Sequence, residues 1–400
     1  MRLAVLAAAA TLAAPAFASP DPADWPAVLA EARGQTVYWH AWGGSPEVND
    51  YIAWVGREMA ARHGVRVEHV KVADISETVS RVLAEKGAGR ETGGAVDLMW
   101  INGENFAAMK RNDLLFGPWA EATPNWALVD VEGVPGVRFD FTVPTEGLES
   151  PWGKAQIVFF HDAARMPEPP RSMIALLATA EANPGRFAYP APPDFTGTTF
   201  LKQALLELVE DAAPLFGPAE EADFAGTTAP LWAFLDALHP HLWRRGAAWP
   251  ASGPQLRSMM ADGEIDLAFS FNPNEAALAI ATGLLPDTVR AYVFDGGSIG
   301  NVHFVAIPFN ASAKAGAMAT ADFLLSPEAQ ARKADPAVWG DGPVIAVDAL
   351  PPEDRALFDA IDFGVGALGP ADLGPALPEP HPSWVRLLEA EWARRYGAGR

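Results

Sequence analysis

The alternation of strand-like and helix-like segments over the first hundred residues constrains the fold of this chain most strongly. Three segments are rich in β-branched and aromatic residues, as strands are: 35–41, 65–72 and 96–101. Between the first two, Ser45 is placed to cap a helix that opens at Pro46 and ends at Gly64. Residues 74–77 form a capping-box pattern before a second helix. This β-α-β-α-β order predicts a parallel sheet with helices on its faces.

A second block of the same kind follows a Pro/Gly-rich stretch. Strands are predicted at 156–160, 186–189 and 265–271, and helices lie between them. Two more strands, 289–294 and 302–307, flank a predicted loop at 295–300. A helix follows at 313–334, and the remainder is Pro-rich with two short helices. Since 400 residues exceed what one hydrophobic core normally supports, we expect two domains.

The charge balance excludes some partners. The chain carries 50 Asp and Glu against 29 Lys and Arg, a formal charge of −21, and this argues against nucleic acid and against an anionic membrane surface. It contains no cysteine, which excludes disulfides, thiolate metal sites and cysteine catalysis. No cofactor motif meets its structural context, and the pair His239 and His241 has no obvious third partner for a metal.

The N-terminus has the three parts of a secretory signal peptide. Arg2 is followed by an uncharged apolar run, 3–14, and by the small-x-small pattern Ala16-Phe17-Ala18. We expect cleavage after Ala18 and a periplasmic mature protein. The alternative is a buried first helix.

Three blocks of sequence carry a resemblance to a known family. They are 37–44 (Val-Tyr-Trp-His-Ala-Trp-Gly-Gly), 96–106 (Val-Asp-Leu-Met-Trp-Ile-Asn-Gly-Glu-Asn-Phe) and the late pair 305–308 and 325–330. The chain resembles the periplasmic solute-binding proteins of ABC importers with type II topology, and more narrowly their YnjB-type subfamily. The resemblance implies a two-lobed α/β fold, each lobe a sheet flanked by helices, joined by crossing strands. It also implies a small-molecule solute held between the lobes, delivery to a membrane permease, a monomer, no cofactor and no catalysis.

The same resemblance implies a division of the chain. The first lobe would take 24–153 and return for 295–340, and the second would take 154–294. The Pro-rich segment 341–400 would pack on the lobes with its short helices.

Candidate ligand residues follow from a physical rule. Ligands of open parallel sheets bind beyond the carboxyl ends of the strands, where helix N-termini present free N–H groups. We therefore expect contacts from the turns after the predicted strands, from one helix N-terminus and, more weakly, from the crossing segments. These residues are His40, Trp42, Gly43, Gly44, Asn102, Gly103, Glu104, Asn105, Thr196, Gly197, Thr198, Asn272, Asn274, Trp152 and Ser298.

The chemistry of these residues favours a polar or cationic organic solute, since Glu104 can hold a cation and tryptophan faces hold cations or rings. Structural alternatives stay open: Asn102 could cap a helix and Trp42 could belong to the core. A different function is a periplasmic serine hydrolase, because Gly296-Gly297-Ser298-Ile299-Gly300 matches a nucleophile elbow in letters. That chemistry requires a strand-to-helix turn, whereas a strand is predicted here. A sensor that uses the same fold without transport is a third possibility.

Overall fold

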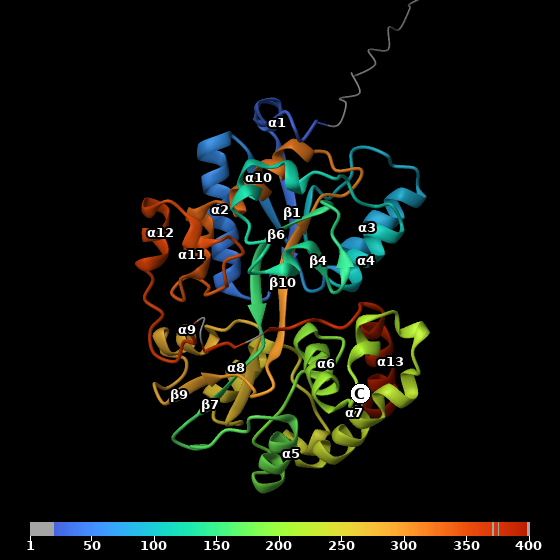
Figure 1. Ribbon diagram of the computed structural model, residues 1–400, viewed down its shortest axis with the longest axis vertical. Coiled ribbons are helices and arrows are strands. Elements are labelled where there is room, and N and C mark those ends of the chain that lie inside the picture. The colour runs from blue at the N-terminus through green and yellow to red at the C-terminus, as the bar shows by residue number, and fades with distance from the viewer. Residues whose placement is uncertain (1–19, 370–371, 375, 398–400) are drawn as a thin grey trace, which may run out of the picture.

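The computed structural model describes residues 20–369, 372–374 and 376–397, which fold into two α/β lobes stacked along the long axis of the molecule (Figure 1). The predicted signal peptide and its cleavage site lie outside the described residues. The first lobe begins with α1 and ends its first pass with β6. Its elements are α1 (Trp25–Ala32), β1 (Thr36–Trp42), α2 (Pro46–His63), β2 (Arg66–Val72), α3 (Ser76–Gly87), β3 (Leu98–Ile101), α4 (Glu104–Arg111), β4 (Phe139–Asp140), β5 (Val143–Pro144) and β6 (Glu149–Gln156).

The chain then builds the second lobe, returns to the first and finishes in the second. The second-lobe elements are β7 (Val158–Asp162), α5 (Met173–Ala182), α6 (Phe195–Leu208), α7 (Phe224–Leu238), α8 (Gly253–Ala261), β8 (Leu267–Ser270), α9 (Glu275–Ala281) and β9 (Val289–Tyr292). The remaining elements are β10 (Ser298–Ala306), α10 (Lys314–Leu324), α11 (Pro327–Ala334), α12 (Pro352–Asp359), β11 (Ala376–Leu377) and α13 (Ser383–Tyr396).

The first-lobe sheet confirms the predicted parallel core. Its strands run in the order β11-β10-β3-β1-β2, and β6 pairs with β10. The strands β1, β2 and β3 are parallel, whereas β10 is antiparallel to both β3 and β6. Two apolar groups lie on the sheet: one unites α1, α2 and α10, and the other unites α3 and α4. The carboxyl ends of β1, β2 and β3 therefore share one edge, which faces the second lobe.

The second lobe has its own apolar core around a three-stranded sheet, β8-β7-β9, in which both pairings are antiparallel. The strand predicted at 186–189 is wrong, because only Phe187 forms a bridge, to Leu267. The C-terminal helix α13 belongs to this core, since Trp384, Leu388 and Trp392 are buried in it. The helix α13 thus packs on a lobe that the chain began much earlier, at β7.

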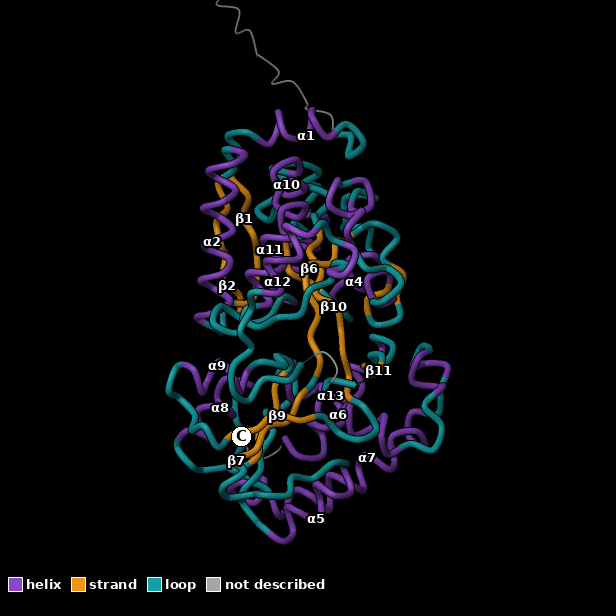
Figure 2. Tube along the Cα trace, turned by 60° about the vertical axis from the view of Figure 1, so that its left-hand side comes forward, coloured by secondary structure: helices purple, strands orange, loops and turns teal. Residues whose placement is uncertain are grey.

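The chain crosses between the lobes three times. It crosses where β6 continues into β7 and where β9 leads to β10. The third crossing leads from α12, which packs against α11, to α13 on the second lobe. Its described residues 376–382 run beside β10, below the first lobe (Figures 1 and 2), and β11 pairs in parallel with the start of β10.

The boundaries of α2 agree with the caps predicted from the sequence. Ser45 accepts a hydrogen bond from the Val48 amide, and Gly64 ends α2 with φ of 67°. The capping box at 74–77 is wrong in detail, because Asp74 accepts from the Ser76 amide and α3 opens without a side-chain cap. The loop predicted at 295–300 is also too long, since β10 already begins at Ser298.

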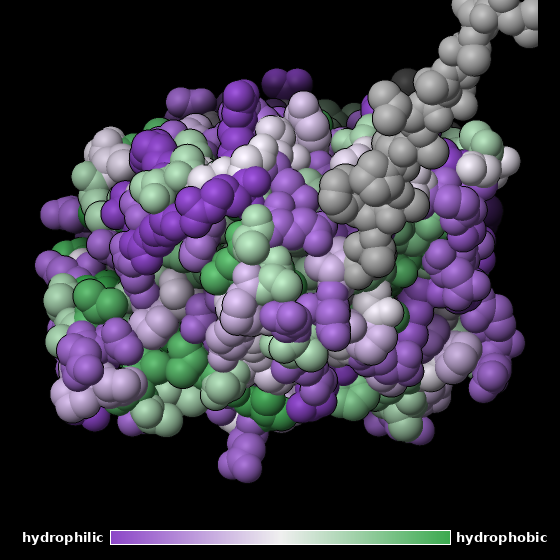
Figure 3. All heavy atoms as spheres, turned by 90° about the horizontal axis from the view of Figure 1, so that it is seen from above, coloured by the Kyte–Doolittle hydropathy of each residue, from purple (hydrophilic) through white to green (hydrophobic). Residues whose placement is uncertain are grey.

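Hydrophilic residues cover most of the face seen from above, on the side of α1, and hydrophobic ones are scattered among them (Figure 3). Within the described part of the chain, no helix is both long enough and apolar enough to cross a bilayer.

Candidate functional site

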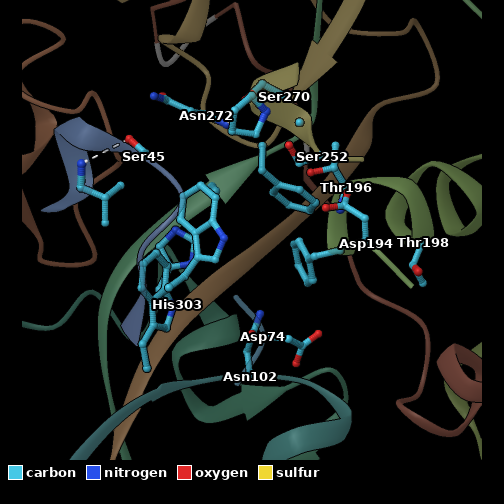
Figure 4. A pocket seen from close by; sticks show the side chains of 18 of the residues that line it. Ser45, Asp74, Asn102, Asp194, Thr196, Thr198, Ser252, Ser270, Asn272 and His303 are labelled. Atoms are coloured by element: carbon cyan, nitrogen blue, oxygen red, sulfur yellow. Dashed lines mark hydrogen bonds between the residues drawn. The ribbon is translucent and has the colours of Figure 1, made fainter. Parts of the chain in front are cut away.

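A cavity of about 310 Å³ lies where the two lobes face each other. The first lobe contributes the turns after β1, β2 and β3, and the second contributes the end of β8 and the N-terminal turns of α6, α8 and α9. Figure 4 shows Asp74 and Asn102 on one side and Asp194, Thr196 and Thr198 on another, with aromatic side chains between. The volume suits a small organic molecule.

Trp42 lies on the wall of the cavity, at the carboxyl end of β1. The two glycines after it make room for its ring and for a neighbouring strand. A β-carbon at Gly44 would lie 2.3 Å from the Trp42 indole, and one at Gly43 would lie 2.6 Å from the β-carbon of Lys71. Gly43 and Gly44 do not line the cavity. They act by seating Trp42 rather than by contacting a ligand.

The turn after β3 brings Asn102, Glu104 and Asn105 to the cavity. Gly103 adopts φ of 64° at the start of α4 and donates its amide to Asp140 at 2.8 Å. Burial raises the pKa of Glu104 to about 7, and Glu389 and Asp74 act in the same direction against Lys202. Near neutral pH, the Glu104 side chain is therefore present both as the protonated acid and as the carboxylate. A bound cation would favour the carboxylate form.

The N-terminus of α6 forms the opposite wall. Its cap is Asp194, which accepts from the amides of Thr196 and Gly197 at 3.0 and 3.1 Å. The helix α6 thus begins at Phe195, and Thr196 and Thr198 lie in its first turn. Thr196 and Thr198 do line the cavity, and the Thr198 hydroxyl donates to Glu389 of α13 at 2.8 Å.

The turn after β8 ties the lobes together. Asn272 donates its amide to the carbonyl oxygen of Trp339, and Asn274 donates to that of Gly340, both at 2.7 Å. Trp339 belongs to the core of the first lobe. Asn272 lines the cavity while Asn274 lies outside it. These two residues thus fix the relative placement of the lobes, whatever Asn272 contributes to a ligand.

Aromatic rings form much of the remaining wall. Trp100 packs edge-on against Trp152 and His303, with ring centroids 4.9 and 5.2 Å apart. The other aromatic side chains that line the cavity are Trp42, Phe141, Phe160, Phe195, Phe269, Phe271 and Trp339. Such a wall holds an apolar chain, a ring or a cation.

Carboxylates greatly outnumber cations around the cavity. They are Glu47, Asp74, Glu104, Asp194, Glu275, Asp341 and Glu389. Two of these have cationic partners: Glu275 lies 2.7 Å from Arg257, and Asp341 lies 2.6 Å from Lys333. Within the described residues the other five form no ion pair. The cavity is therefore strongly acidic, and both lobes supply the charge.

Several predicted site residues lie outside the cavity. His40 is buried and its Nδ1 bonds to Thr78, and Trp152 is fully buried against Trp39. Gly103 and Gly197 are also absent from the wall. Ser298 is fully buried and donates to the carbonyl oxygen of Ile157 at 2.6 Å, while Gln156 donates to it. Ser298 begins strand β10 and its hydroxyl bonds to Ile157 and Gln156, so the strand-to-helix turn of a nucleophile elbow is not formed at this residue.

Of the Asp, Glu, Lys and Arg side chains that line the cavity, the sequence predictions named only Glu104. Asp74 and Glu275 could have been found, because Asp74 lies in the turn between β2 and α3 and Glu275 is the first residue of α9, after the turn that follows β8. Lys202, Arg257 and Glu389 lie inside helices and reach the cavity only through tertiary packing. Nothing in their local sequence marks them.

Comparisons with known proteins agree with this architecture. Residues 54–354 match the family model of bacterial extracellular solute-binding proteins. The chain is 48% identical to the Escherichia coli (strain K12) protein YnjB over 374 residues, covering 94% of each. A Listeria monocytogenes structure named for spermidine/putrescine ABC transport superposes with a TM-score of 0.64 at 16% identity, covering 91% of this chain and 99% of the other. AfuA, a periplasmic binding protein from Actinobacillus pleuropneumoniae, gives 0.63 at 14% with the same coverage, and that structure holds fructose-6-phosphate. The predicted two-lobed type II fold is confirmed.

Proposed function

The chain belongs to the family of bacterial extracellular solute-binding proteins, and from this premise we propose that it captures a small organic cation between its lobes for an ABC importer. The observation that carries the choice of ligand is the set of five cavity carboxylates that form no ion pair with another described residue, Glu47, Asp74, Glu104, Asp194 and Glu389. An ammonium group placed among them would satisfy several at once, and the aromatic wall would hold its organic part.

The mechanism follows from where these charges come from. Asp74 and Glu104 belong to the first lobe, whereas Asp194 and Glu389 belong to the second. Like charges that face each other across a cleft disfavour the closed, empty form. A cation bound between them removes this repulsion and adds contacts to both lobes, so it shifts the equilibrium toward closure. The permease would recognise the closed form.

We further propose the finer features that the family leaves open. The mature protein would begin after Ala18, act in the periplasm as a monomer and alter no chemical bond in its solute. The moving bodies would be residues 24–153 with 295–340, and residues 154–294, with the C-terminal segment packing on both. Ser298 would have no catalytic role, since its hydroxyl is buried and bonded to backbone.

Binding to the mature chain tests the proposal. Putrescine, spermidine and choline would be compared with 1,4-butanediol as a neutral analogue and with fructose-6-phosphate as an anion. A true solute at ~100 times its dissociation constant raises the free energy of unfolding by about 2.7 kcal/mol, which a thermal shift detects. We expect stabilisation by one or more of the cations. Stabilisation by the anion or the diol alone would overturn the assignment of ligand charge.

Transport is tested separately by uptake. Deletion of the gene should abolish uptake of the stabilising cation at low external concentration, and expression of the intact chain should restore it. Normal uptake in the deletion strain would favour a sensor over a transport component.

A further inference from the structure

The third interlobe crossing places one carboxylate directly behind the cavity. Residues 376–382, called here the C-terminal strap, run from β11 to the start of α13 (Figure 1). The strap is attached to β10 by the pairing of Ser298 with Ala376 and of Ile299 with Leu377. Glu379 follows Leu377 after one intervening residue, Pro378. Its Oε1 accepts from Asn301 of β10 at 3.3 Å, and its Oε2 lies 2.6 Å from the Lys202 ammonium.

Lys202 is the partner that gives this carboxylate its importance. It lies on α6 and lines the cavity, and the side chains of Lys202 and Glu379 are only 1% and 2% exposed. Its ammonium lies 4.5 Å from the ring centroid of Phe141 and 5.5 Å from that of Phe195. Lys202 is also near enough to Glu104 and Glu389 to lower the pKa of each, against the larger effect of burial.

The cavity therefore contains a cation that could neutralise its own ligand-binding carboxylates. A lysine side chain has several rotatable bonds, so its ammonium can reach any carboxylate within a few ångströms. Glu104 and Glu389 have no ion-pair partner of their own within the described residues. With Glu379 present, the Lys202 ammonium forms an ion pair with a carboxylate that lies outside the cavity. Without it, the ammonium would turn to Glu104 or Glu389 and occupy the position of a cationic solute.

We propose that Glu379 is a positioning residue that sets the cation selectivity of the cavity by holding the Lys202 ammonium away from the cavity carboxylates. This inference rests on the proposed function for its biological meaning. It adds a determinant of specificity that never contacts the solute and that comes from the last forty residues of the chain. It also assigns a purpose to the strap, which delivers this carboxylate to the second lobe while remaining paired with a crossing strand.

Three variants separate this role from a merely structural one: Glu379→Gln, Lys202→Met and the double variant Lys202→Met/Glu379→Gln. Glu353→Gln, at an exposed position of α12, serves as the control. The first readout is the affinity for putrescine and spermidine by calorimetry. The second needs no ligand: it is the titration midpoint of Glu104 in chain labelled with ¹³C at glutamate carboxyl groups, the resonance being assigned by its loss in Glu104→Gln.

Glu379→Gln should weaken amine binding about tenfold or more, which corresponds to about 1.4 kcal/mol. It should also lower the midpoint of Glu104 by about one pH unit, because Lys202 is then free to pair with that carboxylate. In the double variant, the amine affinity and the Glu104 midpoint should both return toward their wild-type values. The reason is that the Lys202 ammonium, which would otherwise pair with Glu104, is absent. Lys202→Met removes the cation that lowers the pKa of Glu104, so the variant should raise the Glu104 midpoint provided that it folds, which circular dichroism checks.

Two results would overturn the inference. One is an unchanged Glu104 midpoint in Glu379→Gln. The other is a double variant as impaired as Glu379→Gln, which would mean that Glu379 matters only for packing. If neither amine binds the wild type, the proposed function fails for those cations, while the titration still decides the role of Glu379.

Discussion

The side-chain amide of Asn274 donates to the carbonyl oxygen of Gly340 at 2.7 Å, and this hydrogen bond joins the second lobe to the first. The approach is possible because residue 340 has no side chain. A β-carbon there would lie 2.5 Å from that of Asn274, and its φ of 86° also favours glycine.

Gly340→Ala should therefore push the lobes apart. We expect a loss of about 1–3 kcal/mol in the free energy of unfolding, from overpacking and backbone strain, and a weaker affinity for the solute. Denaturant unfolding and small-angle scattering measure the two effects. Gly217→Ala is the matched control, because φ is −112° and nothing lies within 4 Å of the added carbon. Equal effects of both substitutions would contradict the interlobe role.

Trp42 should contribute to solute binding through the face of its ring. Trp42→Ala removes a cavity wall, and we expect affinity for the stabilising cation to fall about tenfold or more, since cation–π and apolar contacts contribute about 1–2 kcal/mol. Gly44→Ala should reproduce much of this loss, because its β-carbon would lie 2.3 Å from the indole. Calorimetry measures both variants. Gly87→Ala, which has open space around it, should bind as wild type does.

Glu104 should make cation binding depend on pH. Its pKa is raised to about 7, chiefly by burial, so the carboxylate form that attracts a cation predominates only above neutral pH. Affinity for the stabilising cation should rise between about pH 6 and 8 and then level off, as the carboxylate form becomes complete. Calorimetry across this range tests it, and Glu104→Gln should bind weakly with little pH dependence. A wild-type affinity that is flat over the same range would argue against Glu104 as a ligand.

The raised pKa of Glu104 makes the unliganded protein less stable as pH rises, whereas it makes cation binding stronger. A carboxyl group whose pKa is raised in the folded state binds more protons folded than unfolded, so stability falls as pH rises from about 4.5 to 7. Glu104→Gln removes this penalty. Without solute the variant should be more stable than wild type at pH 8 by about 1–3 kcal/mol, and the advantage should vanish below about pH 4.5. Urea unfolding at both pH values measures it.

Lys333 should be a structural requirement of the first lobe. Its side chain is fully buried and lies 2.6 Å from Asp341, which also accepts from His303 at 2.9 Å. Lys333→Met leaves a buried carboxylate with only the histidine as partner and should cost about 3–5 kcal/mol of unfolding free energy. Lys333→Met/Asp341→Asn should recover much of this loss. A single variant as stable as wild type would contradict the interpretation.

The fold could be predicted from local signals to a large extent. Apolar strands at 35–41, 65–72 and 96–101, each followed by a turn, led to the parallel core of the first lobe, and the blocks around Trp42 and Asn102 carried the family resemblance. The second lobe was harder to predict from the sequence. Its sheet is antiparallel, and the segment 186–189 has strand composition but contributes only one bridge. Tertiary packing decided that outcome and local propensity did not.

The candidate site divides in the same way. Trp42, Asn102, Glu104, Asn105, Thr196, Thr198 and Asn272 line the cavity because strands end and helices begin there. Three predicted glycines support the wall without lining the cavity. Gly44 makes room for the Trp42 ring, Gly43 makes room for Lys71, and Gly103 donates its amide to Asp140. No local sequence pattern marks Glu379 or Glu389 as a site residue. Their partners in α6 are Lys202 and Thr198, which precede them by 177 and 191 residues. Only the folded chain brings them together.

The location of α13 in the second-lobe core has a consequence for biogenesis. Trp384 and Trp392 fill that core, so a chain emerging N-terminus first cannot complete the second lobe until residues 383–396 have been synthesised. The first lobe likewise waits for β10, which pairs with β3 on one side and with β6 on the other. Both lobes therefore complete their cores only after β10 and α13 have been made, so the final packing of both occurs late in synthesis.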